Sequence, residues 1–175
     1  MKPSLTDTLC TRCGLCCDGS LFADVELASQ AEATGLEILG LEIEEDDADG
    51  KLLSQPCAAL LGTRCGIYAH RPRCCRTFEC RLLRDVRHGA VSVERAKEHI
   101  AGVLKRIRRV RELLVELGHV NERLPLKECC ADALAIEAAT NPELNRRHAE
   151  LETAMTAVER KIRKTFLGGG GRSGT

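Results

Sequence analysis

Hydrophobic residues recur every seven positions between Ser92 and Gly118, in two registers separated by polar residues. A seven-residue repeat keeps its members on one face of an α-helix, so this pattern predicts a long amphipathic helix. Ser92 is suited to cap the start of that helix, and Gly118 is suited to end it. The first register consists of Val93, Ile100, Ile107 and Leu114, and the second of Ala96, Val103, Val110 and Leu117.

A second hydrophobic stripe begins after Asn141-Pro142, with spacings that alternate between four and three residues. Two such stripes predict an antiparallel helical hairpin over residues 92–167, with a shorter helix over 127–139 between its arms. We interpret the hairpin as a packing element, and a protein-binding or dimerising coiled coil is the alternative. His148 lies on the stripe and is interpreted as a half-buried core residue rather than a ligand. The stripe comprises Leu144, His148, Leu151, Met155, Val158 and Ile162.

The first 91 residues contain no long stripe, and turn-forming residues interrupt their hydrophobic positions often. This half therefore predicts short helices and strands. The whole chain is expected to have an α+β fold, in which a small metal-organised, cysteine-rich module packs against the C-terminal helical hairpin. The elements expected in the module are a helix that Asp24 caps, running to about Thr34 and ended by Gly35, a strand over 36–43, an acidic loop over 42–49, a returning strand over 50–54, and a helix from Pro72 to about Val86.

Charge and length narrow the classes of protein to which the chain can belong. Its 175 residues include 26 Lys and Arg and 26 Asp and Glu, so the net charge gives no general reason to expect nucleic acid or an anionic membrane as a partner. The basic run Lys105–Arg111 has no aromatic residues beside it, which favours a solvated, Glu-paired helix face and argues against a nucleic-acid site. No run approaches the roughly 18 apolar residues of a membrane span.

Cysteines divide the chain unevenly, because nine of the eleven fall between Cys10 and Cys80. This distribution predicts a cysteine-cluster metal-binding module over 1–91, the helical hairpin over 92–167, and a disordered Gly-rich tail over 168–175. The odd total excludes complete pairing into disulfides, and the first residues show no apolar segment typical of a secretory signal. We therefore expect a cytoplasmic protein whose clustered thiols bind metal, with a disulfide framework as the alternative.

The first cysteine cluster is Cys10-x2-Cys13-x2-Cys16-Cys17. Gaps of two residues allow consecutive thiolates to fold around one centre, and Gly14 permits the backbone that such a turn needs. The same run of three cysteines occurs in ferredoxin-type loops, which take a fourth ligand from elsewhere. Because adjacent side chains diverge, one thiol of the Cys16-Cys17 pair is expected to face a second centre or a distant partner.

The second cluster contains four short motifs after residue 55. They are Pro56-Cys57, Cys65-x-Ile67-Tyr68, Arg71-Pro72-x2-Cys75-Arg76 and Phe78-x-Cys80. Together with the first cluster, they resemble the YkgJ-type cysteine-cluster family of zinc- or iron-chelating domains, over about residues 10–80. The resemblance implies eight metal-binding cysteines: Cys10, Cys13, Cys16, Cys17, Cys57, Cys65, Cys75 and Cys80.

The other residues of this region receive supporting roles. Cys74 occupies a variable position of the family pattern, and Cys129 and Cys130 lie outside the pattern, so all three are interpreted as ordinary thiols. Residues 64–87 contain seven Arg, which could neutralise a thiolate centre and donate hydrogen bonds to its sulfurs. The candidates for positions beside the ligands are Arg71, Arg76 and Tyr68, with His70 as a further donor or an alternative ligand.

Eight thiols would supply two four-thiolate centres, or one cluster and a redox or second-ion pair. A cysteine run with no ligating His in the family pattern favours an iron–sulfur cluster, of the 4Fe-4S type, over structural zinc. The predicted function is a metal-binding or redox module that serves a partner. An enzyme that uses the cluster to modify a protein or a small molecule is the alternative.

Overall fold

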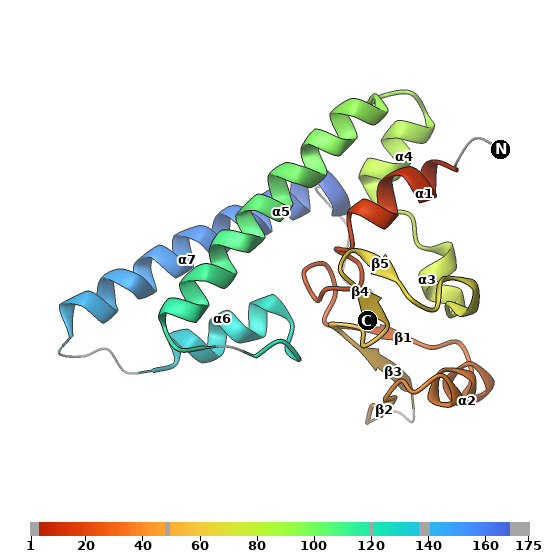
Figure 1. Ribbon diagram of the computed structural model, residues 1–175, viewed down its shortest axis with the longest axis horizontal. Helices are drawn as coiled ribbons and strands as arrows, with labels where there is room; N and C mark the ends of the chain where they lie inside the picture. Colours follow the sequence, from red (N-terminus) through yellow and green to blue (C-terminus); the bar gives the residue numbers. More distant parts are fainter. Residues whose placement is uncertain (1–3, 48–49, 120, 137–140, 169–175) are drawn as a thin grey trace. The chain divides into compact units, whose positions relative to one another are not determined.

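The computed structural model describes residues 4–47, 50–119, 121–136 and 141–168. The fold is α+β, with long helices and short antiparallel strands (Figure 1). The chain divides into two compact units. The helical unit comprises Met1–Leu9, Glu79–Asn121 and Leu126–Thr175, and the cysteine unit comprises Cys10–Phe78 and Glu122–Pro125. The domain boundary predicted near residue 91 therefore falls inside the helical unit, and it stays a prediction about which segments fold together.

The two longest helices of the helical unit, α5 and α7, lie side by side and antiparallel (Figure 1). At one end, Arg147 donates from Nη1 to the carbonyl oxygen of Glu116 at 3.0 Å. At the other end, Lys161 Nζ lies 3.1 Å from His99 Nδ1. The predicted antiparallel hairpin is therefore present. The elements of this unit are α1 (Leu5–Leu9), α4 (Arg81–Arg87), α5 (Val93–Glu116), α6 (Leu126–Leu134), α7 (Pro142–Ile162) and a π-helical turn, η3 (Arg163–Leu167).

Most of the predicted stripe residues are buried, and the others, His148 included, are half-buried. The Ser92 hydroxyl accepts a hydrogen bond from the Arg95 N–H at 3.2 Å, and Gly118 follows α5 with φ +76°, so both ends of this helix agree with the sequence. Asn141 caps α7 in the same way. Removing these faces from water is the main stabilising contribution of the unit. Its buried stripe residues are Ala96, Ile100, Val103, Ile107, Val110 and Leu114 on α5, and Leu151, Val158 and Ile162 on α7.

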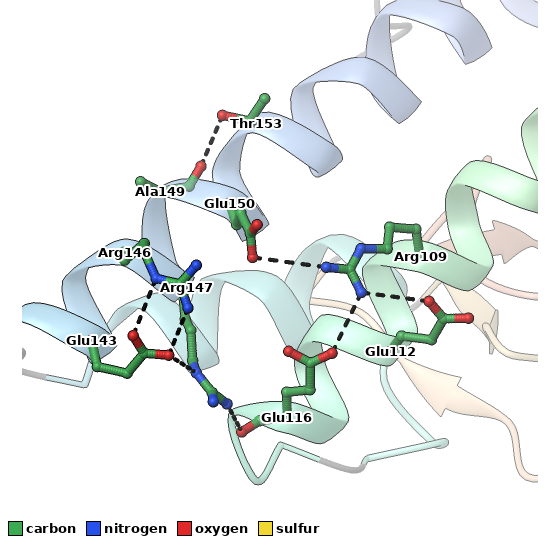
Figure 2. Close-up of polar contacts among 9 residues, drawn as sticks. All are labelled: Arg109, Glu112, Glu116, Glu143, Arg146, Arg147, Ala149, Glu150 and Thr153. Carbon is green, nitrogen blue, oxygen red and sulfur yellow. Dashed lines mark hydrogen bonds and ion pairs between the residues drawn. The ribbon is translucent and has the colours of Figure 1, made fainter.

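Several ion pairs lie at the end of the hairpin where α5 ends and α7 begins (Figure 2). The Arg109 guanidinium lies 3.4 Å from Glu116 in its own helix and 3.8 Å from Glu150 in α7. Arg109 belongs to the basic run Lys105–Arg111, so Glu pairing is confirmed at this residue. Exposed pairs of this kind contribute at most about 1 kcal/mol each, which leaves the buried stripes to hold the helices together.

Two of the predicted segments include residues that the structure does not describe. The helix predicted over 127–139 is α6, which ends at Leu134 rather than at residue 139. Residues 137–139 lie outside the described residues. The tail predicted over 168–175 also lies outside them, apart from Gly168.

The cysteine unit is built around a three-stranded antiparallel sheet, in the order β1-β3-β2, and a separate β4-β5 hairpin. Val25 pairs with Leu53, and Leu60 pairs with Cys65. Its elements are η1 (Cys10–Arg12), β1 (Asp24–Glu26), α2 (Gln30–Ile38), β2 (Glu44–Glu45), β3 (Lys51–Ser54), β4 (Leu60–Leu61), β5 (Arg64–Cys65), η2 (Tyr68–His70) and α3 (Arg73–Thr77). The core of this unit consists of Leu27, Ala33, Leu36, Leu41, Leu53 and Cys57.

Two sequence predictions around α2 were wrong. Asp24 begins strand β1 instead of capping a helix, and the helix begins after Ser29, whose hydroxyl accepts from the Glu32 N–H at 3.3 Å. The strand predicted over 36–43 is also wrong, because Leu36 lies in α2. Its spacing of three from Ala33 places both side chains on the helix face that meets the core. The returning strand predicted over 50–54 is confirmed as β3.

The single helix predicted from Pro72 to Val86 was also wrong, because the chain forms two helices, α3 and α4. Phe78 leaves the helical conformation between them, and its N–H bonds to the carbonyl oxygen of Cys74 at 3.0 Å. The Phe78 ring packs edge-on against Phe22, with centroids 5.0 Å apart. Because Phe22 and Phe78 are far apart in the sequence, no local sequence pattern predicts the break between the two helices.

Candidate metal centre

The first cysteine run forms a tight turn that receives the tip of the β4-β5 hairpin. Gly14 has φ +71°, and a Cβ atom there would lie 3.2 Å from the Thr63 Cα. The Thr63 hydroxyl donates to the carbonyl oxygen of Thr11 at 2.7 Å. Since Thr63 lies two residues before Cys65, these contacts attach the strand that carries Cys65 to the first run.

Cys57 is fixed to the same turn through its backbone. Its N–H lies 2.8 Å from the carbonyl oxygen of Cys17 and 3.1 Å from the side-chain oxygen of Gln55. Gln55 is buried and donates in turn to the carbonyl oxygen of Leu53 on β3 at 3.3 Å. Gln55 therefore ties Cys57 to strand β3, and the backbone hydrogen bond holds Cys57 beside Cys17.

Helix α3 supplies two adjacent thiols, whose sulfur atoms are 4.0 Å apart. Cys74 packs against the hydrophobic core of the unit. Cys75 is close enough to Cys17 and Cys57 for their thiols to raise its pKa. Because that core contains Cys57 and also receives Cys17, both thiols of this pair lie near the Cys17 and Cys57 segments.

Four thiols from separate segments affect one another, and we call Cys17, Cys57, Cys65 and Cys75 the four-thiol group. Burial first, and then the thiols of Cys57 and Cys65, raise the pKa of Cys17 to about 12. Burial also raises the pKa of Cys57, and the nearby Cys65 thiol raises it further. The hydrogen bond with Cys74 raises the pKa of Cys75 most, followed by burial, and the same bond lowers the pKa of Cys74 to about 7.

The donor chemistry of this group suits a soft metal. Its members are sulfur atoms in a partly buried, low-dielectric setting, and a bound metal would take the place of the thiol protons. Sulfur donors of this kind select zinc or iron–sulfur clusters. Among residues 4–47, 50–119, 121–136 and 141–168, no three His, Cys, Asp or Glu side chains stand in an arrangement that could hold a metal ion. Metal ligation by these cysteines therefore stays a prediction.

The other four predicted ligands have separate positions. Cys10, Cys13 and Cys16 are half-buried on η1 and the turn that follows it. Cys80 belongs to the helical unit and precedes α4, where burial raises the pKa of its thiol against hydrogen bonds from the N–H groups of Leu83 and Leu82.

Among the predicted supporting residues, Arg71 has the best-defined contacts. Its guanidinium lies 3.6 Å from the centre of the Tyr68 ring, and its Nε donates to the Tyr68 carbonyl oxygen at 3.1 Å. Its charge also opposes the rise in the pKa of Cys17. Arg76 and His70 are exposed, and the charge of Arg76 acts on the Glu32 carboxylate.

Of the three remaining cysteines, Cys74 contacts Cys75, and the other two belong to the helical unit. Cys129 and Cys130 are buried on α6 of the helical unit, and the Cys129 thiol donates to the carbonyl oxygen of Asn121 at 3.2 Å. Burial raises the pKa of Cys130 to about 12.

Sequence analysis missed Glu32, which bridges two helices of the cysteine unit. Its carboxylate accepts hydrogen bonds from the N–H groups of Arg73, at 2.8 Å, and Ala28, at 3.0 Å. The motif Ser29-x-x-Glu32 has the spacing of a capping box, which could have located both the start of α2 and this residue.

Comparison with known proteins identifies the family. Residues 9–99 match the family model of the CxxCxxCC domain, described as a "putative zinc- or iron-chelating domain". No curated protein and no solved structure matches the chain. In the part of the chain that the structure describes, no helix has the length and apolar character to cross a membrane. Because the matched residues make up more than half of the chain and contain the cysteine motifs, the chain belongs to the CxxCxxCC family of zinc- or iron-chelating domains.

Proposed function

We propose that the cysteine unit is a thiolate-held metal module whose centre is the four-thiol group. The observation that carries this proposal is that hydrogen bonds and packing bring the first run, the Cys57 turn, strand β5 and helix α3 together in one unit. A cluster of buried, neutral thiols gives a fold little by itself, since thiols form only weak hydrogen bonds. Binding of a soft metal ion by these thiols would stabilise the unit, because the free energy of metal binding then contributes to folding.

An iron–sulfur cluster, of the 4Fe-4S type, is the metal group that we propose, and zinc is the alternative. Four thiolates around either group leave a formal charge of about −2, which favours a nearby cation. Arg71 supports this role, because its guanidinium is anchored on Tyr68 and acts on Cys17. Hydrogen bonds and charge next to the sulfurs are also what tune the potential of such clusters, so the module would serve electron transfer to a partner.

We further propose that Cys10, Cys13 and Cys16 bind a second metal centre. This part rests on the family pattern and on the side chain of Cys17, which belongs to the four-thiol group while the run before it carries three more thiols at two-residue gaps. A reducing compartment such as the cytoplasm belongs to the same proposal, because thiolate ligands must stay reduced.

Anaerobic purification tests the proposal. The protein should be brown, with a broad absorption band near roughly 400 nm, because thiolate and sulfide transfer charge to ferric iron. Iron and acid-labile sulfide should be present in equal amounts. A colourless protein with stoichiometric zinc and no sulfide would replace the cluster by a structural zinc site. A protein with neither metal would contradict the proposed function.

A further inference from the structure

A contact between two basic side chains crosses the helical hairpin. Lys161 on α7 has its Nζ atom 3.1 Å from Nδ1 of His99 on α5, and both side chains are half-buried. Since an ammonium group only donates hydrogen bonds, this contact requires a neutral imidazole that accepts at Nδ1. The neutral imidazole satisfies a hydrogen bond of Lys161 but does not neutralise its charge.

Further cations lie around this contact. Spacings of four and seven residues place Arg95, His99 and Arg106 on one face of α5. Partial burial first, and then the charges of three neighbours, lower the pKa of Lys161. These neighbours are Arg106, Lys164 and Arg95, which come from α5 and from the turn η3 that follows α7. The boundary between α5 and α7 therefore gathers positive charge from both sides.

Carboxylates do not neutralise three of these cations. Arg106, Lys161 and Lys164, which we call the cation group, form no ion pair with any Asp or Glu in the part of the chain that the structure describes. Arg106 donates instead from Nη1 to the carbonyl oxygen of Gly102 in its own helix, at 2.7 Å. Like charges this close repel one another, so the folded hairpin holds the cation group at a cost in free energy.

The opposite end of the hairpin shows a different arrangement of charge (Figure 2). There Arg109 lies 3.4 Å from Glu116, and Arg147 lies 3.0 Å from Glu143. The hairpin thus places glutamates beside its arginines, but away from the cation group. A set of cations that is kept together without carboxylates attracts an anion from solution.

We infer that the cation group and His99 form a binding site for the phosphate group of a small molecule, or for free phosphate, at the boundary between α5 and α7. Phosphate oxygens accept charge-assisted hydrogen bonds from guanidinium and ammonium groups, and the dianion would offset the repulsion among them. Three cations suit a single phosphate group, whereas a nucleic acid needs a longer row of cations along its backbone. The site belongs to the helical unit, so it does not depend on the metal proposed for the cysteine unit.

The imidazole signal of His99 in NMR spectra of the full-length protein tests this site. Inorganic phosphate is titrated at constant pH and compared with potassium chloride at the same ionic strength, which matches the general screening of charge. Phosphate should shift the signal until it saturates, and chloride should not. Arg106→Gln and Lys161→Gln should each lower the affinity for phosphate roughly tenfold, because each removes a charged donor. A phosphate monoester, titrated in the same way, shows which of the two forms of phosphate binds more tightly.

Lys105→Gln is the matched control, because it removes the same charge one residue away from Arg106. Lys105 is exposed, and adjacent residues of a helix face about 100° apart, so this variant should keep the wild-type affinity for phosphate. Thermal unfolding gives a second readout, since phosphate that binds the folded chain raises Tm. That rise should be smaller in Arg106→Gln than in Lys105→Gln.

The inference fails if phosphate and chloride act alike, or if Lys105→Gln loses as much affinity as Arg106→Gln, since either result reflects general screening of charge. It is also overturned if a single-stranded oligonucleotide binds more tightly than phosphate and loses affinity in Lys105→Gln as well. That result would assign the cations of α5 to a nucleic-acid surface.

Discussion

At the scale of single residues, adjacent cysteines have different roles. Cys74 and Cys75 share a thiol–thiol contact of 4.0 Å, yet only Cys75 lies in the four-thiol group. In Cys75→Ser we expect less than about a tenth of the wild-type metal affinity, since losing a ligand costs more than losing an outer partner. Cys74→Ser should keep full metal content. Metal analysis of anaerobically purified variants measures both, and the reverse result would make Cys74 the ligand.

A glycine in the same unit makes a second residue-scale prediction. Gly19 has φ +74°, and a Cβ atom there would lie 2.9 Å from the Cα of Pro125. Gly19→Ala should therefore lower the free energy of unfolding by about 1–3 kcal/mol, from overpacking added to backbone strain. Urea unfolding measures this change. Gly40→Ala is the matched control, because Gly40 has φ +83° but no atom within 4 Å of the added methyl. Equal losses in the two variants would show that the contact with Pro125 contributes nothing.

At the scale of elements, the helical hairpin depends on its buried stripes. Ile107 is 2% exposed on α5, so Ile107→Ala should lower the free energy of unfolding by about 2–5 kcal/mol. The neighbouring Arg108 is exposed, and Arg108→Ala should change the free energy of unfolding by less than about 0.5 kcal/mol. Thermal or urea unfolding followed by circular dichroism distinguishes them. Similar effects of both substitutions would contradict the packing of α5 on α7.

The short elements show where prediction from sequence fails. The long helices α5 and α7 were predicted nearly to the residue, because a seven-residue stripe repeated over several turns is a strong local signal. Helix α2 was misplaced, although Ser29-x-x-Glu32 was available as a start signal. The break between α3 and α4 had no such signal, since it depends on the contact of Phe78 with Phe22.

At the scale of the whole molecule, the two units should respond differently to loss of metal. Chelation should remove hydrogen-exchange protection from the cysteine unit, because metal binding there takes the place of a larger core. Helices α5 and α7 should keep theirs. Mass spectrometry of the exchange reaction, with and without a chelator, measures both.

Helix α4 decides between the two divisions of the chain. It lies before residue 91, so the boundary predicted from sequence groups Arg81–Arg87 with the cysteines, whereas the compact units group it with α5. Protection of α4 that survives chelation would favour the compact units. If α4, α5 and α7 all lose protection together with the cysteine unit, the chain unfolds as one domain.

The sequence by itself determined the family, the cysteine motifs, the helical hairpin with its buried stripes and the α+β class, because these follow from spacing along the chain. Only the tertiary structure decided which cysteine-bearing segments lie side by side. Cys57 reaches Cys17 through a backbone hydrogen bond, Cys65 through the Thr63 contact with Thr11, and Cys75 through a helix held by Glu32. Each of these contacts joins residues 40 or more positions apart, and no local pattern of side chains records such a pairing.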